Sequence, residues 1–371
     1  MSDRNTTPGD SVESLTKSVP VQFERIEPPH QSQTHNRTPY VGRYWLGEDL
    51  QGFRSPFEIP HKDASPILIA GPPRSAKSST LASLAYELQT NHGYSYISLF
   101  DDGRMETPRM ALPTSDEDVI DSLRPFSKDP TGIETEVFYP DSCDVLGEFP
   151  ENFTPFTIDP DDIPREFKAS AGMDALERAG IVGAPDAETN LDMEAVIADQ
   201  SAAAVLCCNF LDEDHRAAKY ALADLWAQLI FEARDTNPRL PRVVLGIRGL
   251  KHVAPATLSD SEHSNVVRCL RETMHKLFEE GASRRILILA EAQHTGPPVD
   301  NLRGRISDRI SGPVQTHCGP RILFGMGPAK DYARGFGELV TFHNSVGPIE
   351  FRPAPCSLGD GSTHWLDEYG E

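Results

Sequence analysis

The segment GPPRSAKSS contains residue types that bind the phosphates of a nucleotide. It lies between a short apolar run and an amphipathic helical pattern. The phosphate-loop pattern has two glycines five residues apart, followed by lysine and then serine or threonine. Gly71, Lys77 and Ser78 match this pattern, and Ala76 stands where the second glycine is expected.

Each matching residue has a chemical task in such a loop. Successive backbone N–H groups and the helix N-terminus bind the β- and γ-phosphates. Lys77 adds a positive charge, and Ser78 offers a hydroxyl to Mg²⁺. We therefore predict a site for ATP and Mg²⁺, with Ser78 as the metal ligand. The predicted nucleotide-binding residues are Gly71, Pro72, Pro73, Arg74, Ser75, Ala76, Lys77, Ser78 and Ser79.

Ala76 leaves two conformations open. A positive φ at this position would cost about 1 kcal/mol because alanine carries a Cβ atom. A helical φ would suit alanine well.

A catalytic phosphate-loop enzyme also needs an acid at the end of another strand, to hold Mg²⁺ and orient water. The run RVVLGI is the expected strand, but Arg248 and Gly249 follow it. If this pair has disabled the site, Gly249→Glu would raise turnover. If another acid has replaced it, the best candidates are Asp101 and Glu291, which also follow apolar runs. Further acids at strand ends are Asp102 and Asp212 to Asp214.

Strands alternate with helices along the chain, so we predict an α/β fold with a mostly parallel sheet covered by helices on both faces. The predicted strands are 66–70, 94–100, 135–140, 202–208, 242–247, 285–290 and 321–326. The predicted helices are 78–89, 117–126, 213–234, 264–282 and 302–310.

The composition divides the chain into one large domain and smaller parts. Residues 1–38 are polar and predict a disordered arm, and 39–62 predict a small N-terminal β-hairpin element. The nucleotide domain is expected over 63–355, with an acidic, proline-rich insertion at about 141–192 on the sheet edge. A polar tail, 356–371, ends the chain.

The charge composition is typical of salt-adapted proteins. There are 56 acidic and 35 basic residues, a net charge of −21, and arginine outnumbers lysine. At about 1 M salt the Debye length is only about 3 Å, so this charge need not destabilise the fold. We predict a halophilic origin; an ordinary acidic protein from a GC-rich genome is the alternative. The acidity argues against a broad basic surface for nucleic acid, although not against a local one.

Other features indicate a cytoplasmic protein. No run of about 18 apolar residues predicts a membrane span, and the N-terminus lacks the pattern of a leader. The six cysteines form no C-x-x-C pair, so a structural zinc is not expected.

The order of these motifs resembles the FtsK/HerA family of motor ATPases. The glycine-bounded GEDLQG, 47–52, precedes PILIAGPPRSAKSSTL, as in that family. The strand before Asp101 is similar to the family's second strand, which also ends in an acid. RILILAEAQ resembles its late strand, in which Gln293 would be the polar sensor. The chain is accordingly identified as a divergent member, from a halophilic archaeon or one of its mobile elements.

The resemblance implies a RecA-like P-loop NTPase that forms a ring, usually a hexamer, and moves double-stranded DNA by ATP hydrolysis. It also implies an arginine from the neighbouring subunit, for which Arg303, Arg305 and Arg309 are candidates; they equally fit surface arginines of a polar helix. A degenerate nucleotide-binding subunit for assembly or regulation is the alternative. In a third possibility, a small-molecule kinase, the insertion would be a lid, but it is not basic enough to hold phosphates.

Overall fold

The computed structural model describes a sheet-based domain in which the phosphate-loop strand has a central position. The described residues are 41–49, 56–62, 66–71, 77–100, 117, 120–121, 134–142, 152–183, 187–208, 211, 216–253, 263–293, 305–306, 308–311, 339–343 and 347–353. None of the helices in these ranges is both long and apolar enough to cross a lipid bilayer. The predicted arm 1–38, the strand 321–326 and the tail 356–371 lie outside them.

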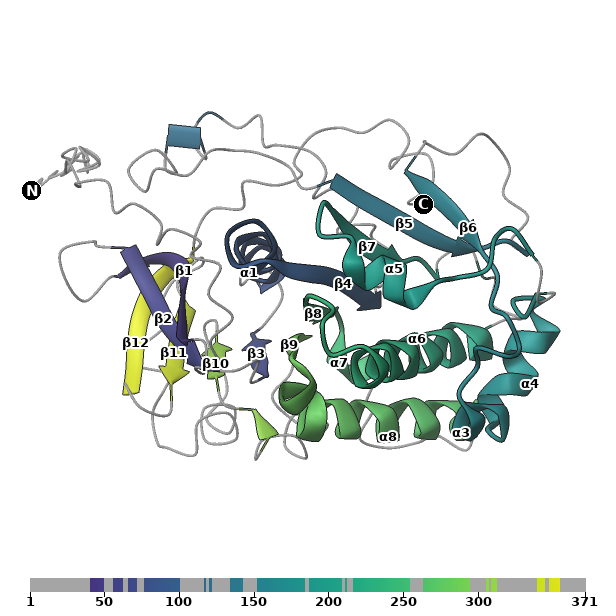
Figure 1. Cartoon of the computed structure of the whole chain (residues 1–371). Helices are drawn as coiled ribbons and strands as arrows, with labels where there is room; N and C mark the ends of the chain where they lie inside the picture. Colours follow the sequence, from purple (N-terminus) through teal and green to yellow (C-terminus); the bar gives the residue numbers. More distant parts are fainter. Residues whose placement is uncertain are drawn as a thin grey trace, which may run out of the picture.

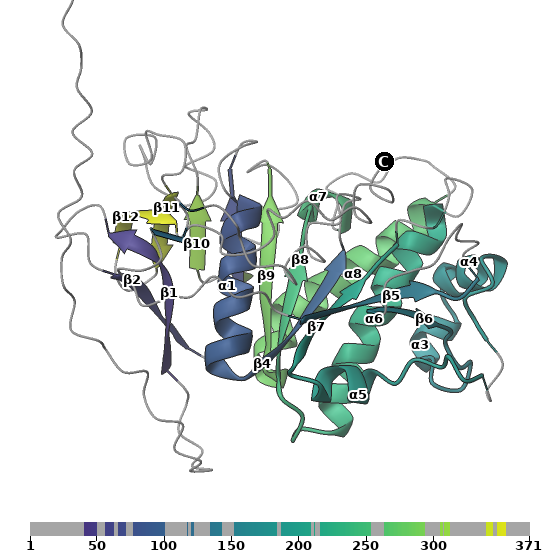
Figure 2. The same ribbon diagram turned by 90° about the horizontal axis from the view of Figure 1, so that it is seen from above.

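One twelve-stranded sheet organises the domain, in the order β2-β1-β12-β11-β10-β3-β9-β8-β4-β7-β5-β6 (Figures 1 and 2). From β10 to β6 all neighbouring strands pair in parallel, and from β2 to β10 they pair antiparallel. The strands are β1 Val41–Asp49, β2 Pro56–Lys62, β3 Ile67–Ala70, β4 Tyr94–Phe100, β5 Glu134–Pro140, β6 Phe153–Phe156, β7 Ala202–Leu206, β8 Arg242–Ile247, β9 Ile286–Ala292, β10 Asp308–Ser311, β11 Leu339–His343 and β12 Gly347–Pro353.

Helices cover both faces of this sheet (Figure 1). On the sheet face that α1 covers, Ile67 and Ile69 of β3 are buried in one cluster with Leu84 of α1. On the opposite face, Leu68 is buried in the cluster that contains the apolar residues of α6 and α8. This alternation follows from the two-residue period of a strand, since successive side chains point to opposite faces. The helices are α1 Lys77–His92, α3 Arg165–Lys168, α4 Ala171–Arg178, α5 Met193–Ala198, α6 Arg216–Thr236, α7 Leu250–Val253, α8 Ser264–Glu280 and the 3₁₀ turn η4 Gly281–Arg284. The predicted fold class, a mostly parallel α/β sheet covered on both faces, is confirmed.

The two ends of the sheet come from the predicted hairpin and insertion (Figure 2). The hairpin β1–β2 is not a separate element, because β1 also pairs with β12. The insertion supplies the edge strand β6 and the helices α3 and α4. Its Phe156 and Leu176 are buried in the same core as Trp226 of α6, and the rings of Phe156 and Trp226 lie edge to face at 5.7 Å. The insertion therefore extends the main core.

The prediction of a helix over 302–310 is wrong at its end. Asp308–Ser311 forms β10, which pairs in parallel with β3 and antiparallel with β11. The four residues of this strand carry no strong pattern of their own, and the two neighbouring strands determine their conformation.

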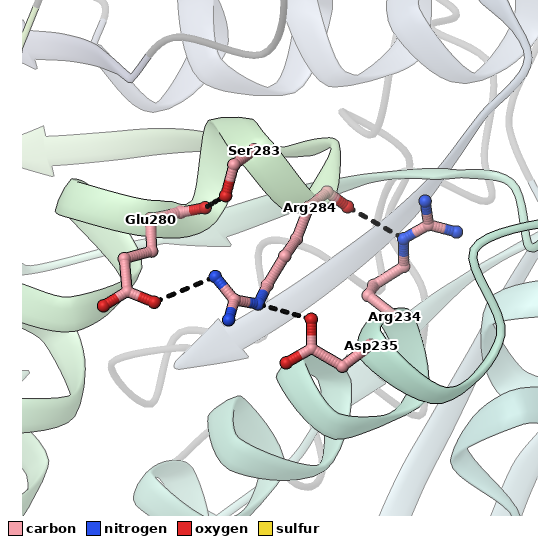
Figure 3. A network of polar contacts seen from close by, with 5 residues as sticks. All are labelled: Arg234, Asp235, Glu280, Ser283 and Arg284. Carbon is pink, nitrogen blue, oxygen red and sulfur yellow. Dashed lines mark hydrogen bonds and ion pairs between the residues drawn. The ribbon is translucent and has the colours of Figure 1, made fainter.

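The amino-terminal edge of β8 and β9 is fixed by a buried arginine. Arg234, near the end of α6, is only 3% exposed. Its Nε donates to the carbonyl of Arg284 at 2.9 Å (Figure 3). Its Nη1 donates to the carbonyls of Leu240 at 2.6 Å and Pro241 at 3.2 Å. Burial, and then the nearby charges of Arg285 and Arg242, lower the pKa of Arg234. These bonds join α6 to the segments that lead into both strands.

Arg284 forms a second, more exposed layer at this edge. Its guanidinium donates to Asp235 at 2.6 Å and to Glu280 at 2.9 Å (Figure 3). The same group lies over the ring of Phe231, 4.0 Å from its centroid. Ser283 completes the turn by donating to the carbonyl of Glu280 at 2.6 Å. This network ties the ends of α6 and α8 together.

Candidate functional site

The predicted phosphate loop joins β3 to α1 at the carboxyl edge of the parallel strands. Gly71 follows β3, and its N–H donates to the carbonyl of Ala292 in β9 at 3.1 Å. Lys77 is the first residue of α1. The residues between them, Pro72 to Ala76, lie outside the described part of the chain. The two conformations predicted for Ala76 therefore both stay open. Both ends of the loop thus occupy the strand and helix positions that the sequence predicts.

Glu291 contacts Lys77 and Ser78, the two predicted phosphate-loop residues at the start of α1. The hydroxyl of Ser78 donates to Oε2 of Glu291 at 3.1 Å, across 213 residues of sequence. The Nζ of Lys77 lies 4.0 Å from Oε1 of the same carboxylate. Lys77 is 5% exposed and Glu291 8% exposed, and Ser78 is half-buried, so the three side chains form a polar cluster between β9 and α1 that is largely shielded from solvent. A buried charge is stabilised by an opposite charge, which Lys77 supplies to Glu291.

The strand β9 positions this carboxylate through its alternation. Leu287 and Leu289 point to the face that α1 covers, whereas Ile288 and Ala290 point to the face of α6 and α8. Glu291 therefore continues the α1 face, directly beside β3 in the register Ile69↔Glu291. Because the carboxyl ends of β3 and β9 meet here, an acid of one strand reaches the helix that follows the other.

Arg248 continues the same face on the next strand. Val244 of β8 lies in the α1 cluster, and two-residue alternation brings Gly246 and Arg248 to that side as well. Arg248 is 3% exposed. The pairing of β8 with β9 ends at Ile247↔Ala290, and Arg248 and Glu291 are the next residues of the two segments. From the motif, Arg248 and Gly249 indicate only that an acid is missing after β8. The alternation of residues in RVVLGI is the sequence signal that predicts Arg248 on the face that α1 covers.

Gly249 has a conformation that bears on the predicted rescue. Its φ is +66°, in the left-handed region that favours glycine. A glutamate there costs about 1 kcal/mol of backbone strain. Gly249→Glu is therefore a poor way to restore an acid at this strand end.

The other predicted residues are only partly described. Gln293 is half-buried and comes directly after β9, two residues beyond Glu291. Asp101, Asp102, Asp212 to Asp214 and Arg303 lie outside the described residues. Ser79 is in the first turn of α1, and Arg309 is in β10.

Arg305 contacts its own subunit. Its guanidinium lies 2.6 Å from Nδ1 of His275 and pairs with Glu279, both on α8. Burial and the charges of Arg305 and Arg271 lower the pKa of His275, which favours a neutral imidazole that can accept from Arg305. An intersubunit role for Arg305 would require it to leave this pair.

The cluster suits a magnesium nucleotide. Mg²⁺ prefers oxygen ligands and is commonly bound through one or two carboxylates together with substrate phosphates. Ser78 and Glu291 offer a hydroxyl and a carboxylate side by side. Because Ser78 donates its proton to Glu291, the lone pairs of its oxygen remain available to a cation. Lys77 and the amino end of the 16-residue helix α1 provide positive charge for phosphate oxygens.

No protein-family model matches the chain, and no curated protein matches it. Solved structures do match. The pCW3 conjugation coupling protein TcpA, in a monomer form with ATPγS, has a TM-score of 0.44 at 14% identity, over 89% of this chain and 70% of that one. The cytoplasmic domain of the type VII secretion ATPase EccC of Thermomonospora curvata has a TM-score of 0.43 at 13% identity, over 84% and 28%.

A third match is the genome packaging NTPase B204 of Sulfolobus turreted icosahedral virus 2, in complex with ATPγS. Its TM-score is 0.38 at 8% identity, over 78% of this chain and 98% of that one. At these values the matches do not carry a function across to this chain.

Proposed function

We propose that this chain binds and hydrolyses ATP, with Lys77 and Ser78 of the phosphate loop acting together with Glu291. The observation that carries the proposal is the contact of Glu291 with both loop residues, at 3.1 Å to Ser78 and 4.0 Å to Lys77. A phosphate-loop NTPase pairs the loop hydroxyl with a strand-end acid to hold Mg²⁺. In this chain Arg248 follows β8, and the neighbouring strand β9 would supply the acid.

The residues would divide the work as follows. Lys77 and the N-terminus of α1 bind and orient the phosphates. Ser78 and Glu291 would hold Mg²⁺, which neutralises the charge that develops on the transferred phosphoryl group. Gln293, directly after β9, is the candidate to orient water, and Asp101 at the end of β4 remains a second candidate acid.

We further propose that hydrolysis moves double-stranded DNA, as in the FtsK/HerA motors that the motif order resembles, and that the chain works as a cytoplasmic homo-oligomeric ring. This part rests on the resemblance of GEDLQG, the phosphate loop and RILILAEAQ. With a net charge of −21, a DNA contact requires a local set of basic residues inside the ring.

Phosphate release from ATP, measured at about 2 M KCl with and without duplex DNA, tests the proposal. Glu291→Gln should lower turnover about 100-fold and leave ATP affinity within about threefold, because the carboxylate acts mainly on the transition state. Glu87→Gln is the matched control, since Glu87 is also a buried acid, 7% exposed, but lies near the far end of α1. Wild-type turnover in Glu291→Gln would contradict the assignment, and an inactive wild-type protein would indicate a degenerate subunit.

The DNA arm of the experiment separates the motor from the ATPase. Salt weakens contacts of basic residues with phosphates, but it also screens the acidic surface from the DNA. We therefore expect DNA-stimulated hydrolysis to depend only shallowly on salt between about 0.1 and about 3 M KCl, with its maximum near 1 M or above. If duplex DNA never stimulates hydrolysis, the proposed DNA-moving function is wrong and the proposed ATPase activity stands. A steep fall of DNA-stimulated hydrolysis with salt, in a protein that stays folded, would contradict the interpretation of the composition as salt-adapted.

A further inference from the structure

Arg248 is a buried cation within the candidate site, where an acid was expected from the sequence. It is 3% exposed and directly follows β8, whose alternation, if continued, would bring it to the face that α1 covers. The pairing of β8 with β9 ends at Ile247↔Ala290, one residue before Arg248 and Glu291, and only β9 separates β8 from β3. The carboxyl edge of these strands thus carries Lys77, Glu291 and Arg248 in a row from the loop outward.

The chemistry of arginine restricts what this position can do. A guanidinium stays protonated in proteins and has five N–H donors but no acceptor, so it cannot replace a metal-binding or water-activating acid. Its planar fork matches the oxygens of a phosphate and binds them in pairs. At the edge where the nucleotide is proposed to bind, a guanidinium can therefore contact phosphate oxygens of the ligand.

We propose that Arg248 distinguishes nucleoside triphosphate from diphosphate by contacting the terminal phosphate from within the same subunit. This inference rests on the proposed nucleotide site. Lys77 and the N-terminus of α1 bind phosphates that both ligands share, whereas Arg248 lies two strands from β3 and acts on the phosphate that ADP lacks. In this proposal, Arg248 stands where the motif expects an acid and adds a contact with the terminal phosphate, while Glu291 provides the acid.

Equilibrium binding of ATPγS and ADP, each with Mg²⁺, tests this role. Arg248→Gln should weaken ATPγS about tenfold, since a hydrogen-bonded charge pair is lost, and should leave ADP within about twofold. If Arg248→Gln does not fold, Arg248→Lys answers the same question, because it keeps a positive charge without the planar fork. Here we expect ATPγS to weaken at least about threefold, again with ADP unchanged.

Two controls separate the possible failures. Arg234→Gln removes another buried arginine, at the opposite edge of the sheet, and should leave the ratio of the two affinities unchanged. Lys77→Ala should weaken both ligands together. If Lys77→Ala does so and Arg248→Gln weakens neither ligand, or both equally, the inference is wrong and the nucleotide site stands. If the wild-type protein binds neither ligand, the nucleotide site fails as well.

Discussion

The two edges of the parallel sheet use buried charges in different ways. At the amino-terminal edge, Arg234 donates to backbone carbonyls at 2.6, 2.9 and 3.2 Å. At the carboxyl edge, the Nζ of Lys77 lies 4.0 Å from Oε1 of Glu291. Here both partners are side chains, one at the start of α1 and one near the end of β9. Short bonds to the backbone fix one geometry, whereas a longer pair between side chains can rearrange when a ligand brings its own charges.

This difference separates structural charges from functional ones. Arg234 and Lys77 are almost equally buried, at 3% and 5% exposed, so burial alone does not distinguish them. Their partners do, because a backbone carbonyl stays in place while a carboxylate can move to a metal. The four predictions below test this contrast from the largest expected effect to the smallest.

Removing the buried arginine should damage stability and spare binding. Arg234→Met leaves carbonyls of Arg284, Leu240 and Pro241 without this donor, and we expect the free energy of unfolding to fall by about 3 kcal/mol. Urea unfolding measures this, and calorimetry with ATP should give an unchanged affinity for the folded fraction. A large loss of ATP affinity would show that the two edges are not independent.

Removing the loop lysine should do the reverse. Lys77→Ala should weaken ATP at least tenfold, which is about 1.4 kcal/mol, because the phosphates lose a buried positive charge. The free energy of unfolding should fall by less than about 3 kcal/mol, the loss expected for Arg234→Met, since the pair with Glu291 is longer, at 4.0 Å, than the bonds of Arg234. Calorimetry at matched salt measures the affinity. An unchanged affinity would remove the nucleotide site itself.

A buried acid between the two edges should make stability depend on pH. Asp224 of α6 is fully buried and accepts from Gln228 at 3.0 Å; burial raises its pKa above the usual 3.8. The folded state then binds this proton more tightly than the unfolded state. Stability is therefore lost as the pH rises from about 4 through the raised pKa.

Asp224→Asn should remove this contribution, so the variant gains stability relative to the wild type as the pH rises. Urea unfolding of both proteins between pH 4.5 and 8 measures the difference. A difference that stays constant over this range would contradict the raised pKa.

The exposed layer at the amino-terminal edge should matter least. Arg284→Gln breaks pairs with Asp235 and Glu280 whose carboxylate side chains are 53% and 44% exposed. We expect a loss below about 1 kcal/mol, and a smaller one at about 1 M KCl, where exposed pairs are screened. The remaining loss at high salt would report the contact with the ring of Phe231. If Arg284→Gln lowers the free energy of unfolding as much as Arg234→Met does, solvent exposure does not determine how much each arginine contributes to stability.

Buried parallel strands were predictable because they are continuous apolar runs. The run 242–247 is β8 with the same bounds, and the runs before Gly71 and Glu291 are β3 and β9. β6 and β10 were not predictable, since their sequences FTPF and DRIS, unlike the equally short ILIA of β3, are not continuous apolar runs and depend on their neighbours in the sheet.

The candidate site was predictable in its parts more than in its geometry. The phosphate-loop motif identified Lys77 and Ser78, and Glu291 was identified as an acid at a strand end. Its contact with Ser78 depends on β3 and β9 being neighbours although they are far apart in sequence, which no local pattern shows. The burial of Arg248 could not be predicted from the motif, which indicates only that an acid is missing at this position.

The pairing of β1 with β12 also has a consequence for synthesis on the ribosome. Gly47 lies opposite Pro353, so the partner of β1 is translated about 300 residues later. At 5–20 residues per second this interval is about 15 to 60 seconds. The phosphate-loop strand β3 also waits, because both of its neighbours, β9 and β10, come late in the chain. A nascent chain that lacks the last third of the sequence therefore holds β1 without β12 and the apolar strand β3 without either of its neighbours until the final strands emerge.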